Sequence, residues 1–395
     1  MQAIVYACLT FSALTLTAQI ATCTLATARC RIARTPSPRP RDCPPVTLVR
    51  PLCGLEPYSR ETLTSTFAIA YPDYEILFCV DRPDDPIVPL VREIITAHPQ
   101  HRARLLIGKD PISANPKLNN MLKGFREGKH GHIVFVDSNV HTPPDYLAQL
   151  VNALEGDAGL VSAPPVGQAP DDLWSEIECA FLNTYQARFQ YAIDTLGFGF
   201  AQGKTLFFRR ETLEKGGFEM LAAEPAEDAA ATKLIRRAGK RIRLAGPFAQ
   251  LIGPRTARQV WNRQLRWARL RRASFPLLYA PEILAGGAPP LLSLIIASWL
   301  MNIDVAVVAF TFLILWYAPE LLLARLSGWP RSISAMLLRD LMLVPLFVAG
   351  CLGNGFEWHG HLMNAELPQK KGARITRVTR KLGWLRQFKA RFNGP

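Results

Sequence analysis

Short apolar runs alternate with amphipathic stretches through the middle of the chain. The runs have the length and the branched or aromatic composition that is typical of buried strands. They cover residues 46–49, 74–80, 103–107, 132–136 and 159–162. Helical patterns separate them, as at 115–127 and 143–155, and longer helices are expected at 171–192 and 224–238. Alternation of this kind predicts an α/β fold with a doubly wound, mostly parallel sheet.

The N-terminus has the pattern of a membrane anchor. Residues 2–28 carry no charge over about one bilayer thickness, and five arginines follow within 29–41. A cleaved signal peptide carries its positive charge before the apolar run, although Ala26-Thr27-Ala28 leaves cleavage as the alternative. The positive-inside rule then places the body of the protein in the cytoplasm. We expect a transmembrane signal anchor over 1–28, a basic, Pro-rich linker over 29–45 and a catalytic domain over 46–254.

Three further apolar stretches follow residue 283, at 284–301, 305–326 and 337–352. Pro289-Pro290 interrupts the first, and Arg339-Asp340 lies near the start of the third. If the body and the basic C-terminal tail are on one side, an even number of spans must separate them. We therefore expect two full spans in this region, with 337–352 re-entrant or interfacial.

The net charge of +14 comes from two segments. Residues 255–272 hold seven arginines and no acid, and residues 369–391 hold nine lysines or arginines and no acid. Basic clusters beside apolar segments suit an anionic membrane surface. The sequence shows none of the modules of nucleic-acid binders, so we expect no nucleic-acid partner. The predicted organisation is a basic interfacial helix over 255–282, membrane segments over 283–355 and a basic cytoplasmic tail over 356–395.

Acidic residues follow two of the predicted strands. Asp84-Asp85-Pro86 comes after the run 74–80, and Asp137 directly follows 132–136. Ligands of open α/β sheets bind at the carboxyl ends of the strands, so both acids are expected in one site. Glu227-Asp228 opens a later helix, and Arg263-Gln264-Leu265-Arg266-Trp267 lies in the first basic segment.

This order of motifs resembles the inverting, membrane-bound family-two-type glycosyltransferases, which use three aspartates and a (Gln/Arg)-x-x-Arg-Trp motif. Further motifs narrow the resemblance to the ceramide glucosyltransferases, in a bacterial branch, and to the related hopanoid glycosyltransferases. These motifs are Pro51-Leu52-Cys53-Gly54, Tyr71-Pro72-Asp73-Tyr74-Glu75 and Asn115-Pro116-Lys117-Leu118-Asn119-Asn120. The resemblance implies a glycosyltransferase-A-like fold. It also implies a multi-pass protein, in a bacterial inner membrane, that moves glucose or a related hexose from a UDP-sugar to a lipid hydroxyl, most closely that of ceramide.

The resemblance assigns three residues to the donor. Asp85 would bind the uracil or ribose, Lys117 the donor phosphates, and Asp137 the diphosphate together with Mg²⁺ or Mn²⁺. Hard divalent cations are often shared between carboxylates and substrate phosphates. Asn139 stands where a full Asp-x-Asp motif would offer a second acid. The alternative for Asp85 is that it caps the next helix.

The remaining motifs would carry the chemistry. Asp228 would be the general base that takes the proton of the acceptor hydroxyl, with Glu227 in support, and burial should raise its pKa. Arg263 and Arg266 lie three residues apart on a helix and would stabilise the diphosphate leaving group. Trp267 would cover the sugar or the acceptor. First-turn acids and a purely interfacial basic helix are the structural alternatives.

The resemblance leaves one departure from the family's pattern, a further basic cluster and several alternative functions. Gln186 stands where animal ceramide glucosyltransferases carry a His, so a proton-handling role would be absent there. We expect Arg269, Arg271 and Arg272 to contact lipid headgroups. A hopanoid glycosyltransferase, a processive polysaccharide synthase and a non-catalytic membrane scaffold are the alternative functions, and the intact acids and Arg-Trp motif disfavour the scaffold.

Overall fold

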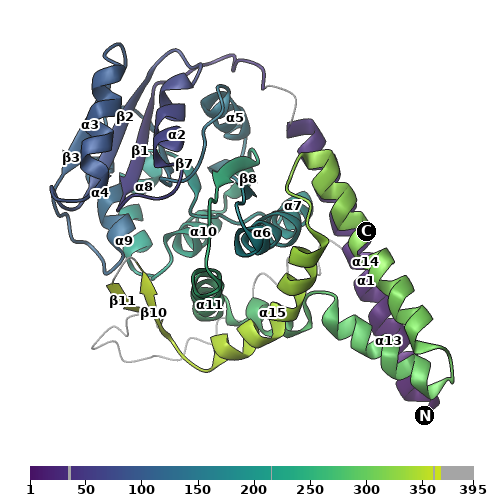
Figure 1. Cartoon of the computed structure of the whole chain (residues 1–395). Coiled ribbons are helices and arrows are strands. Elements are labelled where there is room, and N and C mark those ends of the chain that lie inside the picture. The colour runs from purple at the N-terminus through teal and green to yellow at the C-terminus, as the bar shows by residue number, and fades with distance from the viewer. Residues whose placement is uncertain (34–36, 215, 359–360, 366–395) are drawn as a thin grey trace, which may run out of the picture.

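The computed structural model describes residues 1–33, 37–214, 216–358 and 361–365. Figure 1 shows an α/β domain on one side and long helices that extend away from it on the other. Most of the predicted basic tail, at 366–395, lies outside the described residues.

The α/β domain is built on a seven-stranded sheet with the order β3-β2-β1-β4-β7-β5-β8. Its strands are β1 (Val46–Leu52), β2 (Tyr74–Val80), β3 (Ala103–Ile107), β4 (His132–Val136), β5 (Ala158–Ser162), β7 (Thr205–Arg209) and β8 (Arg241–Leu244). β7 runs antiparallel to β4 and β5, and every other pair is parallel. The mostly parallel sheet and its first five strands are confirmed. Two smaller sheets pair β6 (Pro165–Gln168) with β9 (Phe248–Leu251) and β10 (Gly355–Trp358) with β11 (His361–Asn364).

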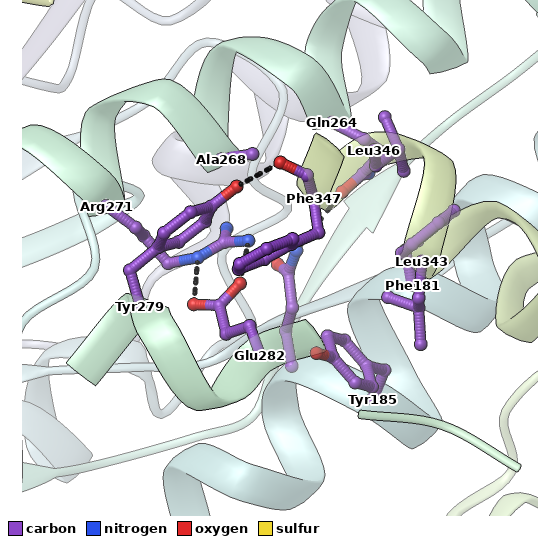
Figure 2. A pocket seen from close by; sticks show the side chains of 11 residues that line it. Phe181, Tyr185, Gln264, Ala268, Arg271, Tyr279, Glu282, Leu343, Leu346 and Phe347 are labelled. Atoms are coloured by element: carbon purple, nitrogen blue, oxygen red, sulfur yellow. Dashed lines mark hydrogen bonds and ion pairs between the residues drawn. The ribbon is translucent and has the colours of Figure 1, made fainter. Parts of the chain in front are cut away.

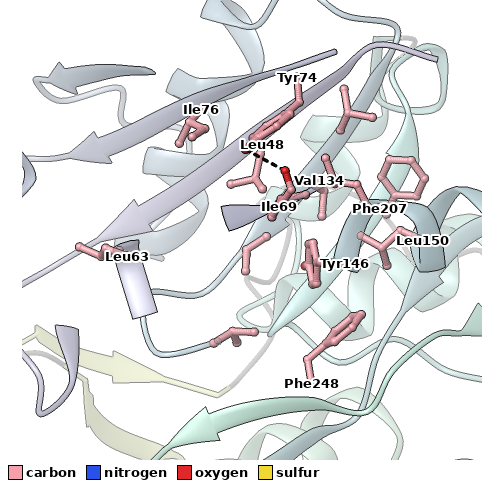
Figure 3. Close-up of a cluster of buried hydrophobic side chains, with 14 of the residues drawn as sticks. Leu48, Leu63, Ile69, Tyr74, Ile76, Val134, Tyr146, Leu150, Phe207 and Phe248 are labelled. Carbon is pink, nitrogen blue, oxygen red and sulfur yellow. Dashed lines mark hydrogen bonds between the residues drawn. The ribbon is translucent and has the colours of Figure 1, made fainter. Parts of the chain in front are cut away.

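Helices cover both faces of the sheet, as the doubly wound prediction requires. The helices of this domain are α2 (Ser59–Thr64), α3 (Ile87–Ala97), α4 (Pro116–Glu127), α5 (Tyr146–Ala153), α8 (Glu211–Glu214), α9 (Gly217–Ala222) and α10 (Glu227–Arg237). On one face Leu48, Ile76 and Val134 pack against α3 and α5 (Figure 3). On the other face the alternate residues Leu77 and Phe135 pack against α4, α9 and α10. This alternation follows from the period of two of a strand.

The long helix predicted at 171–192 is interrupted by a wider turn. It consists of α6 (Leu173–Ala180), a π-helical turn (Phe181–Ala187) and α7 (Arg188–Thr195). π-helical turns are rare and lie frequently at functional sites. This one faces the apolar helices, and its residues join the cluster that those helices form.

The apolar helices are α1 (Gln2–Ala33), α13 (Ala288–Leu300), α14 (Val305–Ser327) and α15 (Ile333–Cys351). By length and composition α1, α14 and α15 could each cross a membrane. α1, α13 and α14 lie side by side (Figure 1). α1 continues past the predicted anchor end at residue 28, because Arg29 meets Asp194 of α7 at 3.0 Å and lies over the Tyr191 ring.

The C-terminal apolar segments differ from the prediction. α15 is one unbroken helix of 19 residues, so no re-entrant turn lies within 337–352. The break lies in the first segment, where the helical stretch Pro276–Leu284 meets α13 at a bend of 43°. α15 packs along α6 and α11 (Ala257–Ser274) of the catalytic part.

A buried polar network joins these helices to the α/β domain. Glu320 of α14 is fully buried and accepts hydrogen bonds from Arg339 of α15, at 2.9 and 3.1 Å, and from Gln19 of α1, at 2.6 Å. Arg188 of α7 lies 3.5 Å from the same carboxylate. Asp340 pairs with Arg339 at 2.8 Å. The two acids and two arginines neutralise one another. Arg339 and Asp340 can therefore lie within a buried helix.

Candidate active site

Asp137 lies at the carboxyl end of β4 and holds two lysines. Its Oδ1 is 2.6 Å from Lys117 Nζ, and its Oδ2 is 2.7 Å from Lys204 Nζ. Burial raises the pKa of Asp137, but the two ammonium groups outweigh it and hold the pKa far below its usual range. Asp137 is therefore an ionised carboxylate at any physiological pH.

Lys117 joins Asp137 to the start of α10. Its Nζ also lies 2.7 Å from Glu227 Oε1 and donates to the carbonyl of Gly203 at 2.6 Å. The second oxygen of Glu227 accepts from Asn115 Nδ2 at 2.9 Å. Burial lowers the pKa of Lys117, but the two carboxylates raise it more, so the ammonium stays charged. The structure thus brings the donor residues Lys117 and Asp137 into one cluster with the acids of α10.

Asp228 lies beside this cluster with both oxygens oriented by backbone amides. Oδ2 accepts from Gly203 N at 3.0 Å, and Oδ1 accepts from Ala229 N at 2.8 Å. Burial and the neighbouring Glu227 raise the pKa of Asp228 to about 6, although Lys117 acts in the opposite direction. A carboxylate with this pKa is ionised at neutral pH and is a stronger base than an ordinary aspartate.

Gly203 allows the close approach of these groups. A Cβ at this position would lie 2.6 Å from Glu227 Oε1 and 3.0 Å from Lys117 Nζ. A larger residue here would displace the ends of these two side chains from their present ion pair.

Asp85 lies at the carboxyl end of β2, in contacts separate from the Asp137 cluster. Its two oxygens accept from the backbone amide of Gly54 at 3.0 and 3.1 Å, and Oδ1 also accepts from Ile87 N at the start of α3. The carboxylate therefore ties the loop after β1 to the first turn of α3. This agrees with the helix-capping alternative, and the nucleotide-binding role stays a prediction.

The arginines of α11 have different surroundings. Arg263 Nη1 lies 3.1 Å from the carboxylate of Glu178, a fully buried residue of α6, and its guanidinium lies over the Trp267 ring at 4.8 Å. Trp267 packs against the cluster of Cys179, Leu182 and Ile252. Arg263 is thus anchored to α6.

Arg266 lies within electrostatic range of Glu178 and of the acidic cluster. Burial and the neighbouring Arg263 lower the pKa of Arg266 to about 10, while the carboxylates of Asp137 and Glu227 act in the opposite direction. The guanidinium therefore remains charged at pH 7 within the field of the two acids.

The predicted cation position at Asp137 offers a single carboxylate whose oxygens both hold ammonium groups. The neighbouring Asn139 accepts from Lys204 at 3.1 Å and donates to Glu56 at 2.9 Å. In the part of the chain that the structure describes, no three His, Cys, Asp or Glu side chains converge on a metal position. A cation shared by Asp137 and a diphosphate would lie beside two ammonium groups, which repel it. The residues therefore do not form a ready cation site, and Mg²⁺ or Mn²⁺ stays a prediction.

The three arginines that we expected at lipid headgroups have protein partners, and their contact with lipid stays a prediction. Arg271 forms a two-armed ion pair with Glu282, at 2.8 Å on each side (Figure 2). Arg269 donates to the carbonyl of Gly355, and Arg272 donates to the carbonyls of Cys351 and Gly353 at 3.3 and 3.1 Å. Carbonyls at the end of α15 attract cations through the helix dipole, which explains this arrangement. The apolar side of α11 is also covered by protein, since Val260 and Ala268 are buried.

Sequence reasoning missed several residues of the cluster. Lys204, Gly203, Asn115 and Glu178 enter it through tertiary packing. The local signals are Gly203-Lys204 just before the apolar run that forms β7, and Asn115 in the motif that also holds Lys117.

Comparison with known proteins identifies the family. The model of glycosyl transferase family 21 matches residues 9–370, which is most of the chain. The chain belongs to glycosyl transferase family 21. The three aspartates and the Arg-Trp motif on α11 all lie within the matched residues.

Ceramide glucosyltransferases are among the proteins to which the chain is similar. Ceramide glucosyltransferase 1 of Caenorhabditis elegans is 26% identical over 243 residues, which cover 60% of this chain and 52% of that protein. Ceramide glucosyltransferase 3 of the same organism is 23% identical over 333 residues, covering 81% and 72%. The ceramide glucosyltransferase of Candida albicans is 34% identical over 127 residues, covering 29% and 23%. The chain thus spans about half the length of the first of these relatives.

A solved structure is similar over most of the family 21 chain. The mannosyltransferase PcManGT from Pyrobaculum calidifontis, in complex with GDP-Man and Mn²⁺, superposes with a TM-score of 0.47 at 21% identity. The match covers 86% of this chain and 97% of that structure.

Proposed function

We propose that this family 21 enzyme moves glucose, or a related hexose, from a UDP-sugar to the hydroxyl of a membrane lipid with inversion. The proposed acceptor is ceramide and the product is glucosylceramide. The observation that carries the proposal is the cluster in which Lys117 joins Asp137 to Glu227 beside the buried Asp228. The cluster combines cationic groups for a diphosphate with a carboxylate of raised pKa at one edge of the sheet. The ceramide glucosyltransferases to which the chain is similar support the choice of acceptor.

Asp228 is the proposed general base. The acceptor hydroxyl oxygen attacks C1 of the sugar, the bond from C1 to the diphosphate oxygen breaks, and the hydroxyl proton passes to Asp228. Its pKa of about 6 keeps it ionised and ready at neutral pH. The amides of Gly203 and Ala229 fix the direction of its oxygens.

Cationic side chains stabilise the leaving UDP. Its diphosphate gains negative charge as the C1–O bond breaks, and fixed positive groups lower the barrier to that step. Lys117, Lys204 and Arg266 are the proposed groups, because all three lie in the field of Asp137. Arg263, anchored by Glu178, orients α11 and adds positive potential.

Two residues complete the proposed site. Asp85 meets the uracil or ribose, and Trp267 covers the sugar. The catalytic domain is proposed to face the cytoplasm of a bacterial cell from the inner membrane, with the basic segments near anionic lipid.

The test uses purified full-length enzyme with UDP-glucose, UDP-galactose and UDP-N-acetylglucosamine as separate donors. Ceramide or a polyhydroxylated hopanoid is supplied in vesicles, with and without Mg²⁺ or Mn²⁺. We expect UDP release with UDP-glucose and a ceramide heavier by one hexose. A glycosylated hopanoid without hexosylceramide would replace the acceptor, and sugar on neither lipid would contradict the proposal.

A further inference from the structure

Three polar side chains form a hydrogen-bonded row beside Asp137 at the edge of the sheet. Glu56 Oε2 accepts from Asn139 Nδ2 at 2.9 Å, and Asn139 Oδ1 accepts from Lys204 Nζ at 3.1 Å. Lys204 Nζ also lies 2.7 Å from Asp137 Oδ2. We call Glu56, Asn139 and Lys204 the edge triad, because they come from the loop after β1, the loop after β4 and the residue before β7.

The backbone around the edge triad is fixed by buried contacts. Arg50 of β1 is fully buried and donates from Nη1 to the carbonyls of Asp137 and Val140, at 2.9 and 3.0 Å, on either side of Asn139. Asp137 N donates to the carbonyl of Lys204 at 3.1 Å. The positions of the amide and of the lysine therefore follow from the sheet itself.

Glu56 is held by the first turn of α2. The hydroxyl of Ser59 donates to the carbonyl of Glu56 at 2.8 Å and accepts from its amide at 2.9 Å. The carboxylate of Glu56 then reaches Lys204 through the Asn139 side chain. Glu56 thus influences the lysine through a neutral amide.

The charges on its two sides fix the orientation of the Asn139 amide. Asn139 is 6% exposed, and its side chain has an acceptor end and a donor end. The acceptor end meets the ammonium group of Lys204, and the donor end meets the carboxylate of Glu56. If the amide were turned over, each end would face a group of its own polarity. An aspartate at this position would place a second carboxylate against Glu56, and like charges at this distance disfavour each other.

Lys204 keeps one N–H donor for a ligand. An ammonium group has three N–H donors, and in the described part of the chain Asp137 Oδ2 and Asn139 Oδ1 take two of them. The Lys204 side chain is 15% exposed, so solvent or a ligand reaches it. The direction of the third N–H follows from the tetrahedral geometry of the group once the other two are held.

We propose that Glu56 is a positioning residue that acts through Asn139 to aim the ammonium group of Lys204 at the donor diphosphate. The amide of Asn139 is required for this role, because it accepts from Lys204 and donates to Glu56 at the same time. The proposal rests on the proposed function for the identity of the donor as a UDP-sugar. It also gives a role to Asn139 at the position where this sequence lacks the second acid of an Asp-x-Asp motif.

Exchanging the carboxylate and the amide tests the edge triad. Calorimetry on the purified full-length protein measures the Kd for UDP, with and without Mg²⁺. Asn139→Asp should raise this Kd about 10- to 100-fold, the effect of one charge-assisted hydrogen bond, because the new carboxylate repels Glu56 and draws Lys204 away from the phosphate. Glu56→Gln combined with Asn139→Asp again has one carboxylate and one amide, in the opposite order. It should return the Kd to within about threefold of the wild type.

Glu56→Gln alone should have a smaller effect. The variant keeps a hydrogen bond to Asn139 but removes its charge, so the Kd for UDP should rise about three- to tenfold. Glu61→Gln removes the same charge from an exposed position on α2 and should leave the Kd unchanged. In sugar transfer, kcat should fall in the same order as the affinity for UDP, because Lys204 acts on the leaving group.

The recovery of UDP affinity in the double variant distinguishes the edge triad from ordinary loop packing. Packing alone predicts lower thermal midpoints with an unchanged Kd for UDP, and that result would overturn the proposal. A wild-type Kd in Asn139→Asp, or UDP binding that comes to require Mg²⁺ in this variant, would also overturn it and would favour a cation site.

A second pair of variants decides if Asn139→Asp fails to fold. Since Glu56 acts through Lys204, Glu56→Gln should not change the Kd for UDP further in a Lys204→Met background. A further loss in that background would overturn the proposal.

The outcomes separate the edge triad from the proposed function. Recovery of UDP binding in the double variant, with no sugar transfer to any lipid, would keep the triad and reject the function. Transfer to ceramide with wild-type kinetics in all these variants would keep the function and reject the triad.

Discussion

Lys117 and Asp137 form a short ion pair, with 2.6 Å between Nζ and Oδ1, that is largely buried. Because the same Nζ reaches Glu227, the lysine connects the donor side of the site to the side of the base. A diphosphate that binds here must share or take this ammonium group. Donor binding would then change the charge that Asp228 experiences.

Replacing Lys117 should weaken donor binding and disturb the base. Lys117→Met removes a charge-assisted contact of roughly 1.5–3 kcal/mol, so the Kd for UDP should rise about 10- to 100-fold. The pKa of Asp228 should also rise in this variant, because the ammonium group of Lys117 lowers it in the wild type. Calorimetric titration of UDP into purified protein measures the first effect. Lys129→Met, on the exposed loop after α4, is the control, and wild-type affinity in Lys117→Met would remove the lysine from the donor site.

The activity should depend on pH through Asp228. Its pKa is raised to about 6, so the base is protonated and inactive below that pH and ionised above it. kcat/KM should therefore rise between about pH 5 and pH 7 and then level off. Asp137 cannot produce this limb, because its pKa is held far lower. A flat profile over this range, or the same limb in the residual activity of Asp228→Asn, would assign the proton transfer elsewhere.

Arg269 and Arg272 should stabilise the fold and contribute little to membrane binding. Their guanidiniums bind carbonyls at the end of α15 and at β10, so replacing both by Ala leaves these carbonyls without charged donors. We expect a lower thermal midpoint and unchanged association with anionic vesicles. Arg258→Ala, exposed on the same helix, should leave the midpoint unchanged. If the variant instead kept the thermal midpoint of the wild type and lost salt-dependent association with vesicles, the two arginines would contact lipid headgroups.

The buried ion pair of Glu320 and Arg339 should be costly to break from one side. Arg339→Met leaves the fully buried Glu320 without its main partner, and such changes cost about 3–5 kcal/mol. Replacing both, as Glu320→Leu with Arg339→Met, should recover part of the loss. The exposed pair Arg60–Glu93 is the control, since Glu93→Gln should change the free energy of unfolding by less than about 1 kcal/mol. Chemical unfolding in detergent measures all four proteins, and equal losses for the two pairs would contradict the assignment.

The sheet could be predicted because its strands are locally encoded. Five apolar runs gave five of its strands, and the acids after two of them lie at the predicted edge. β7 and β8 were missed, and the pairing of β7 between β4 and β5 depends on chain segments far apart in sequence. Lys204 therefore could not be placed beside Asp137 from the sequence.

The membrane segments were harder to predict because burial depends on partners. The charges of Arg339 and Asp340 disfavoured a continuous apolar helix in the sequence. Inside the protein, however, Arg339 pairs with Glu320, and Asp340 accepts from Trp316 and Tyr317. In the same way, the positive charge of Arg269 and Arg272 predicted contact with lipid headgroups. The backbone carbonyls that they bind come from segments far away in the sequence and could not be predicted from it.

The central claim is that Asp228 serves as the base for sugar transfer to a lipid hydroxyl. The most direct measurement is the mass of ceramide after incubation in vesicles with UDP-glucose and either wild-type enzyme or Asp228→Asn. We predict a gain of one hexose with the wild type and a rate lower by about 10²–10⁴ with the variant, which should still bind UDP-glucose with near-wild-type affinity. Equal product with both proteins, or a variant that has lost donor affinity, would contradict this role of Asp228.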